Sequence, residues 1–445
     1  MQRCDTLILA DWCIPVAPAN LVLSAQAVAV IDGRIADILP AEDARRKYLP
    51  GMLLERPGHA LIPGLVNVHT HAAMTLFRGL ADDLALEQWL EQGIWPAEKR
   101  WVSAEMVRDG TRLAAAEMLL AGITCFSDQY FFPEIAAETA VEMYMRAMIG
   151  TPVIEFATAW AADAAECLSK GADLVHDRYA DHPLISSCFA PHSVDTVSDQ
   201  SFRDLRVLAD QLDARIQLHL HESAAEIRRS IDACGMRPVA RLSELGLINS
   251  SLMAVHAVHL SDDEIAQFAA ANVSVAHCPR SNLKLADGIA PVAAMQRAGI
   301  NVALGTDGAA SNNTLDLLAE MRTAALLGKV AADDASAIPA ARALTMATLD
   351  GARSLGLDDS IGSIECGKWA DLCCIDLQQL HSQPLYDPVS QIVYTASAAQ
   401  VSDVWVAGRH LVDAGELTGV DVDDLLGRTA EWQQRIASGM ENATA

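Results

Sequence analysis

The chain has 445 residues, 51% of them hydrophobic and 20% charged, with a formal net charge of -26 at pH 7. This length suits one large barrel with an appended domain, and the acidic balance without a basic patch argues against partners such as nucleic acid or an anionic membrane. The ten cysteines include no Cys-x-x-Cys pair, and the N-terminus lacks a signal-peptide layout, so we expect a cytoplasmic protein with reduced thiols.

The first 60 residues have an all-β pattern. Residues 6–10 and 27–31 are strand-like, and Asp32-Gly33 is a strong signal for a tight hairpin turn. A piece of this size needs partner strands to be stable.

From residue 61 onward, hydrophobic strand-like runs alternate with helical stretches. The expected strands are 61–71, 122–128, 146–156, 184–193, 215–222, 252–260, 273–279 and 301–307. The clearest helical stretches are 104–121, 200–212, 224–245, 262–270, 292–299 and 337–356. Eight strands with crossovers predict an α/β fold, a (β/α)8 TIM barrel over residues 61–367. Polar residues cluster at the carboxyl ends of these strands, where such barrels place their catalytic groups.

The tail returns to a strand pattern at 401–406 and 409–412, with Ala407-Gly408 as the turn, and then a helix is expected over 425–437. We expect the tail to pair with the beginning of the chain. Residues 1–60 and 368–445 would then form one small composite β-sandwich domain.

Eight of the thirteen histidines lie near the predicted catalytic rim, namely His69, His71, His192, His219, His221, His256, His259 and His277. His69 and His71 are two residues apart at the end of the first barrel strand, so their side chains point to the same face. His69 and His71 can therefore bind one ion together, and one of the two histidines His219 and His221 on the fifth strand should face that ion. Asp307, at the tip of the eighth strand, is placed to ligate or to act as a base. Three imidazoles and one carboxylate suit zinc or another divalent first-row metal.

Such a cation lowers the pKa of a bound water toward neutrality. Glu222 lies three residues past His219, on the loop beyond the strand, and suits proton shuttling. Asp307 can accept a hydrogen bond from the water, and His256 can donate one to the developing tetrahedral centre. These residues predict hydrolytic attack on an sp² carbon.

The motifs at 63–71, 219–223, 256–259, 277–285 and 304–313 together resemble the amidohydrolase superfamily. Within it, the likeness is to the branch of 5'-methylthioadenosine/S-adenosylhomocysteine deaminases, near the chlorohydrolases. The resemblance implies one divalent metal per subunit, with zinc as the favoured identity, held by His69, His71, His219 and Asp307. Binuclear members carry a bridging lysine at the end of strand four, where this chain has His192.

The same resemblance implies roles for residues around the substrate. Glu222 would pass a proton to the purine ring nitrogen, His192 would contact the purine, and Glu98 would accept hydrogen bonds from the ribose hydroxyls. Arg146 aligns with one candidate for binding the amino-acid carboxylate of S-adenosylhomocysteine, and it is equally well read as a structural residue at a strand start. No second arginine follows within the next twenty residues, which favours 5'-methylthioadenosine.

The expected activity is therefore a metal-dependent hydrolase that deaminates adenosine-type nucleosides, with 5'-methylthioadenosine as the substrate and S-adenosylhomocysteine as a further one. One alternative is a relative acting on another ring, such as guanine, cytosine or a triazine. Another is a non-catalytic scaffold, which would have lost ligands that are all present here. Barrel helices rich in Ala and Leu predict a homo-oligomer.

Overall fold

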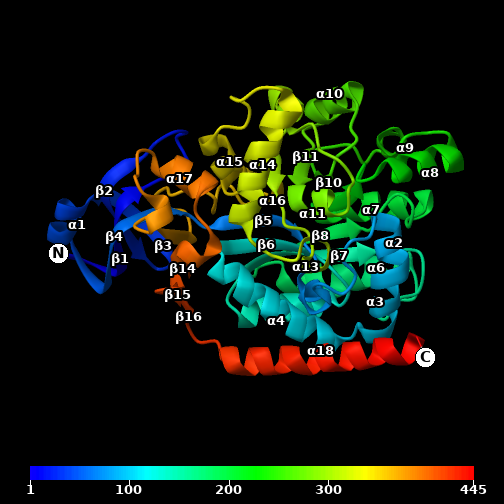
Figure 1. Ribbon diagram of the computed structural model, residues 1–445, viewed down its shortest axis with the longest axis horizontal. Helices are drawn as coiled ribbons and strands as arrows, with labels where there is room; N and C mark the ends of the chain where they lie inside the picture. The colour runs from blue at the N-terminus through cyan, green and yellow to red at the C-terminus, as the bar shows by residue number, and fades with distance from the viewer. Residues whose placement is uncertain (445) are drawn as a thin grey trace. The chain divides into compact units, whose positions relative to one another are not determined.

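The computed structural model describes residues 1–444 of the chain, coloured from the N-terminus to the C-terminus in Figure 1. The chain forms two compact units. One contains residues 1–67, 116–125 and 316–420, and the other contains residues 68–115, 126–315 and 421 onward. The predicted domain boundaries at residues 60/61 and 367/368 stay a prediction.

Within the described residues, eight strands form the barrel sheet in the order β12-β11-β10-β9-β8-β7-β6-β5. They are β5 (Leu65–Thr70), β6 (Ile123–Gln129), β7 (Arg146–Val153), β8 (Ile185–Pro191), β9 (Arg215–Leu220), β10 (Leu252–His256), β11 (Ser274–His277) and β12 (Val302–Leu304). The pairs from β9 to β12 and from β7 to β9 are parallel. Their residues are almost all buried, as expected for strands covered on both faces. The predicted α/β barrel is therefore confirmed, with strands that are shorter than their hydrophobic runs.

The sheet closes on itself between its first and last strands. The amide of Asp307, just beyond β12, donates a hydrogen bond to the carbonyl of His69 on β5 at 3.0 Å. Gly305 makes this close approach possible, because a Cβ there would lie 2.9–3.0 Å from the Cβ, N and O atoms of His69. The closure thus joins two of the predicted ligand-bearing segments.

Helices connect the strands, and two long helical predictions are wrong in detail. The stretch 224–245 is divided into α8 (Ala224–Cys234) and α9 (Pro238–Glu244), because Gly235 ends α8 with a φ of +76° and Pro238 begins the next helix. The stretch 337–356 is likewise divided into α15 (Ala340–Met346) and α16 (Leu349–Leu355).

The other helices of the barrel region agree with the alternating pattern. They are α4 (Ala104–Leu120), α5 (Pro133–Glu142), α6 (Ala164–Gly171), α7 (Asp199–Leu212), α10 (Asp262–Ala271), α11 (Pro279–Lys284), α12 (Val292–Arg297), α13 (Ala309–Asn312) and α14 (Leu317–Ala332). The connection that follows β5 is built from η1 (Ala72–Phe77), α2 (Leu86–Gln88), η2 (Trp89–Ile94) and α3 (Trp95–Trp101). We call residues 78–101 of this connection the insert.

Strands from both chain ends share a second, mixed sheet, in the order β16-β15-β14-β13-β4-β1-β2-β3 within the described residues. They are β1 (Gln2–Cys13), β2 (Leu23–Ile31), β3 (Arg34–Pro40), β4 (Tyr48–Pro63), β13 (Leu372–Asp376), β14 (Val401–Val406), β15 (Arg409–Asp413) and β16 (Glu416–Leu417). The two ends meet where β4 pairs antiparallel with β13. The short helices α1 (Ala41–Lys47) and α17 (Pro388–Tyr394) belong to the same unit. The prediction that strands from both chain ends pair with each other is confirmed, in the form of this mixed sheet.

The hairpin signal at Asp32-Gly33 is also confirmed. Asp32 has a φ of +51° and Gly33 a φ of +73°, the left-handed pair that a two-residue hairpin turn requires, and β2 pairs antiparallel with β3 across it.

The last helix, α18 (Val422–Thr444), is longer than the predicted 425–437. Arg428 and Trp432 of this helix both donate to Oδ2 of Asp109 on α4, at 2.7 and 2.8 Å. Among residues 1–444, no helix has both the length and the apolarity needed to cross a bilayer.

Candidate metal centre and active site

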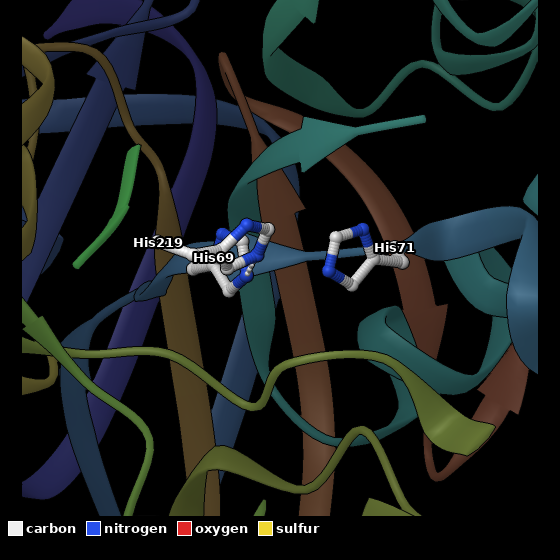
Figure 2. Close-up of side chains that lie close together, drawn as sticks. All are labelled: His69, His71 and His219. Carbon is white, nitrogen blue, oxygen red and sulfur yellow. Dashed lines mark hydrogen bonds between the residues drawn. The ribbon is translucent and has the colours of Figure 1, made fainter. Parts of the chain in front are cut away.

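Three of the predicted ligands meet at the carboxyl ends of their strands. His69 and His71 come from β5 and from the residue just after it, and His219 comes from the end of β9. One nitrogen from each ring lies within 4.8 Å of the others, and the Nε2 atoms of His69 and His219 are 3.2 Å apart. Figure 2 shows the three rings turned toward a common point.

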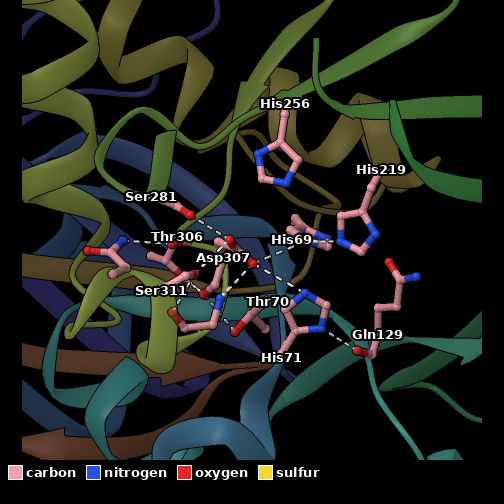
Figure 3. Close-up of polar contacts among 12 residues, drawn as sticks. His69, Thr70, His71, Gln129, His219, His256, Ser281, Thr306, Asp307 and Ser311 are labelled. Carbon is pink, nitrogen blue, oxygen red and sulfur yellow. Dashed lines mark hydrogen bonds and ion pairs between the residues drawn. The ribbon is translucent and has the colours of Figure 1, made fainter. Parts of the chain in front are cut away.

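Asp307 completes this group (Figure 3). Its Oδ1 atom lies 3.2 Å from Nε2 of His71 and 3.5 Å from Nε2 of His69. Its other oxygen, Oδ2, accepts hydrogen bonds from the hydroxyls of Ser281 at 2.6 Å and Ser311 at 2.7 Å. The two serines fix the carboxylate so that Oδ1 faces the histidines.

The hydrogen bonds behind the rings decide which nitrogen faces the centre. Nδ1 of His71 lies 2.5 Å from the carbonyl oxygen of Gln129, and Nδ1 of His219 lies 2.6 Å from that of His192. A carbonyl only accepts, so both Nδ1 atoms carry the hydrogen, and the Nε2 lone pairs point at the common point. This arrangement is typical of metal-ligating histidines. The residues present therefore fit a divalent cation.

The structure also decides which of His219 and His221 faces the centre, a choice that the sequence left open. The Nδ1 atom of His221 lies 3.3 Å from the carbonyl of His259, and its Nε2 atom accepts from the amide of Val239 at 3.4 Å. His221 is fully buried in this packing, so His219 is the member of the pair that faces the centre. His277 is buried as well, and it is not among the described residues that line the cavity.

A cavity of about 410 Å³ opens over His71 and His219 of this group. Its walls include His71, His219 and Asp307 at one end, with Glu222 and His256 beside them. Glu98, His192 and the aromatic side chains Trp89, Tyr130 and Phe156 also line it. This volume is in the range that small-molecule sites occupy.

Glu222 and His256 form a pair at the edge of the centre. The Oε1 atom of Glu222 lies 3.4 Å from Nε2 of His256. Asn282 donates its Nδ2 hydrogen to Nδ1 of His256 at 3.0 Å, so the hydrogen of this imidazole is on Nε2. Burial lowers the pKa of His256 to about 3, which keeps the ring neutral. Burial, with the negative charges of Asp287 and Asp307, raises the pKa of Glu222 well above its usual value.

Two other predicted residues lie further along the cavity. Burial raises the pKa of Glu98 to about 7, against smaller opposing effects of Tyr130 and His71. Burial lowers the pKa of His192 to about 4, and its Nδ1 atom lies 3.0 Å from the hydroxyl oxygen of Thr196. Both side chains line the same cavity as His71 and His219, so a ligand bound in this cavity can meet them.

Arg146 lies elsewhere. It is the first residue of β7, only 4% exposed, and its Nη1 atom donates to the carbonyl of Pro183 at 2.7 Å. The amino end of a barrel strand is opposite the catalytic face, and Arg146 is not among the described residues that line the cavity. The structure does not bring this residue to the site.

Sequence reasoning missed several residues that hold the site together. Glu226 accepts the backbone amides of His221 at 3.2 Å and Glu222 at 2.9 Å, which fixes the loop that carries Glu222. The signal was present as Ser223-x-x-Glu226, the pattern of a helix capping box. Ser281 and Ser311 had no comparable signal, because their contact with Asp307 depends on how the barrel closes.

Comparison with known proteins agrees with this geometry. The profile of the amidohydrolase family matches residues 60–411. A 5-methylthioadenosine/S-adenosylhomocysteine deaminase of Teredinibacter turnerae is 46% identical over 434 residues, covering 98% of each chain. A protein of the same name from Saccharophagus degradans is 44% identical, covering 97% of each chain.

A solved structure shows the same fold. The crystal structure of an adenosine deaminase from Xanthomonas campestris with bound zinc superposes with a TM-score of 0.97 at 49% identity, covering 98% of this chain and 99% of that one. The match of family, relatives and fold extends over nearly all of the sequence, and the chain therefore belongs to the amidohydrolase family.

Proposed function

We propose that this chain is a metal-dependent deaminase that hydrolyses 5'-methylthioadenosine to 5'-methylthioinosine and ammonia, with S-adenosylhomocysteine as a further substrate. One observation supports this most directly: a single cavity is lined by His71, His219 and Asp307 of the centre, by Glu222, and by Glu98 and His192. The two bacterial relatives that are 44–46% identical are named as deaminases of these nucleosides.

We infer that His69, His71, His219 and Asp307 hold one divalent cation, and that this cation is zinc. Three imidazole nitrogens and one carboxylate oxygen are a donor set that zinc accepts, and the Xanthomonas relative has zinc bound. When bound, the cation supplies the Lewis acidity that makes a water nucleophilic near neutral pH. Asp307 holds its Oδ1 atom toward the histidines, where it can accept a hydrogen bond from that water.

Glu222 moves protons between the water and the purine. Its raised pKa favours the protonated carboxyl, which can donate to N1 of the ring, next to the carbon that bears the amino group. The resulting carboxylate can take one proton from the attacking water and pass it to the departing amine, and it recovers the second proton of that water as the carbonyl forms. One water is consumed and one ammonia leaves, so the purine amine becomes a carbonyl.

His256 stabilises the oxygen that adds to the ring. Its hydrogen is on Nε2, because Nδ1 accepts from Asn282. A neutral imidazole that donates from a fixed position can stabilise the charge that develops on this oxygen. The φ of His256 is +73°, a strained value for a residue with a side chain, which is consistent with a position held for function.

His192 and Glu98 would hold the nucleoside. A carboxylate accepts hydrogen bonds from two vicinal hydroxyls, so Glu98 suits a ribose and has no such task on a free base. This residue favours a nucleoside over guanine, cytosine or a triazine as the substrate. The homo-oligomer expected from the sequence stays a prediction, and light scattering coupled to size-exclusion chromatography would test it.

The test is to incubate the zinc-loaded protein with 5'-methylthioadenosine, S-adenosylhomocysteine, adenosine and adenine, and to follow the absorbance change from adenine to hypoxanthine. We expect turnover of the nucleosides and little turnover of adenine, with the zinc-free protein as the control. If zinc-containing protein turned over none of the nucleosides, the proposal would be refuted, and a substrate with a different ring would be favoured.

A further inference from the structure

Arg229 is the one arginine or lysine among the cavity-lining side chains in the part of the chain that the structure describes. It belongs to α8, and its side chain is 48% exposed. Its Nε atom donates to Oδ2 of Asp195 at 2.8 Å, and its Nη1 atom donates to Oε1 of Glu87 at 3.2 Å. One guanidinium at the cavity therefore bridges two carboxylates.

These partners come from different segments of the same unit. Glu87 lies on α2 in the insert, and Asp195 lies in the loop that follows β8. Glu91 lines the same cavity. The local balance is negative, because two carboxylates bond to one guanidinium. Such a surface opposes a simple anion, but it suits a group that carries an ammonium together with a carboxylate.

We propose that Arg229 binds the carboxylate of an amino-acid tail on the 5' sulfur of the nucleoside, and that this carboxylate replaces Glu87. The inference rests on the proposed function, and it assigns the substrate's tail to a residue that lies on α8. The ammonium of the same tail would then meet the carboxylate of Asp195, which stays in place. Arg229 is thus a specificity-determining residue for S-adenosylhomocysteine over 5'-methylthioadenosine.

The geometry explains why the exchange is possible. The side chains of Glu87 and Arg229 are 41% and 48% exposed, and ion pairs in water contribute little to stability. Asp195 is less exposed, at 27%, and continues to hold Nε, so the guanidinium keeps its orientation when Glu87 leaves. The freed edge of an arginine fork binds a carboxylate through two parallel hydrogen bonds.

The experiment measures the ratio of kcat/KM for S-adenosylhomocysteine to kcat/KM for 5'-methylthioadenosine in zinc-loaded protein. In Arg229→Gln, the ratio should fall by about 10- to 100-fold, because one charged hydrogen-bond partner of the tail is lost. In Glu87→Gln, the ratio should rise, because the competitor for Arg229 has lost its charge. The matched control is Arg206→Gln, which removes an arginine that pairs with Asp210 outside the cavity lining, and it should leave the ratio unchanged.

Arg229→Gln and Glu87→Gln break the same ion pair. If this ion pair only stabilised the fold, the two variants would behave alike. If both changed kcat/KM for the two substrates in parallel and left the ratio where it was, the inference would be overturned. It would also be overturned if the wild-type protein deaminated 5'-methylthioadenosine but not S-adenosylhomocysteine, while the proposed deaminase would stand. Wild-type protein that deaminated neither substrate would overturn both.

Discussion

The Nδ1 atom of His219 donates to the carbonyl oxygen of His192 at 2.6 Å. This bond links a side chain of the proposed metal centre, at the end of β9, to the backbone of a residue on the cavity wall. His192 thus has two separable tasks. Its carbonyl fixes the tautomer of His219, and its ring faces the cavity.

The separation gives a first prediction. His192→Ala keeps the backbone carbonyl, so zinc content should stay near that of the wild type while kcat/KM for 5'-methylthioadenosine falls. His219→Ala removes a proposed ligand, so zinc content and activity should be lost together. Metal analysis of the dialysed proteins beside steady-state kinetics checks both. Loss of zinc from His192→Ala would contradict this division of tasks.

The second prediction concerns the proton carrier. Glu222→Gln keeps the size of the side chain but cannot exchange a proton, so kcat should fall by about 10²- to 10⁴-fold. Glu222 is not one of the four proposed ligands, so zinc content should not change. Circular dichroism should show an unchanged fold. A variant that kept more than a tenth of the wild-type kcat would remove Glu222 from the mechanism.

The third prediction concerns the ribose. Glu98→Gln replaces an acceptor of two hydrogen bonds by a group with one acceptor oxygen and an amide donor. We expect kcat/KM for adenosine to fall by about 10- to 100-fold, which corresponds to the loss of a hydrogen bond to a charged group. The trace activity on adenine, which has no ribose, serves as the internal reference and should change little. An equal loss on both compounds would place Glu98 outside ribose recognition.

The fourth prediction concerns the small sheet, where Asp403 is fully buried. Arg56 donates to both of its oxygens, at 2.6 and 2.7 Å, and His410 lies 3.0 Å from Oδ1. Burial alone would raise the pKa of Asp403, but the hydrogen bonds from His410 and Arg56 outweigh it and hold this pKa well below its usual value. Asp403→Asn should lower the free energy of unfolding by about 3 kcal/mol at pH 7, because a buried pair loses one charge.

The pH dependence follows from the direction of that shift. A carboxyl whose pKa is lower in the folded than in the unfolded state stabilises the fold fully above about pH 4, and this contribution is lost as the pH falls further. Denaturant unfolding at pH 7 and pH 3 should therefore show a smaller difference between wild type and Asp403→Asn at the lower pH. Asp413→Asn is the matched control. Asp413 also contacts Arg56, but its side chain is 53% exposed, so its effect should stay below about 1 kcal/mol.

Local sequence was sufficient for the elements of the fold and for placing most of the proposed ligands at the strand ends. The alternation of buried strand runs with helical stretches indicates the barrel, because each strand must be covered on both faces. The spacing of His69 and His71 places both rings on one face of β5. The strand ends also contain Glu222, His256 and Asp307, since the carboxyl ends of barrel strands meet at one face.

Relationships between distant segments were decided only by the tertiary structure. The choice of His219 over His221 depends on where α9 places Val239 and where the loops after β8 and β10 place His192 and His259. The two serines that fix Asp307 come from different segments near β11 and β12, and no local pattern indicates their contact.

Which arginine can reach the substrate was likewise decided only by the tertiary structure. The family resemblance gave Arg146 as one candidate, beside a structural reading, and the fold places it at the amino end of β7, whereas Arg229 lines the cavity from α8. Sequence periodicity specifies which face of an element is buried and which residues end each strand. Which side chains meet across the cavity depends on the register and closure of the barrel, and these are properties of the whole chain.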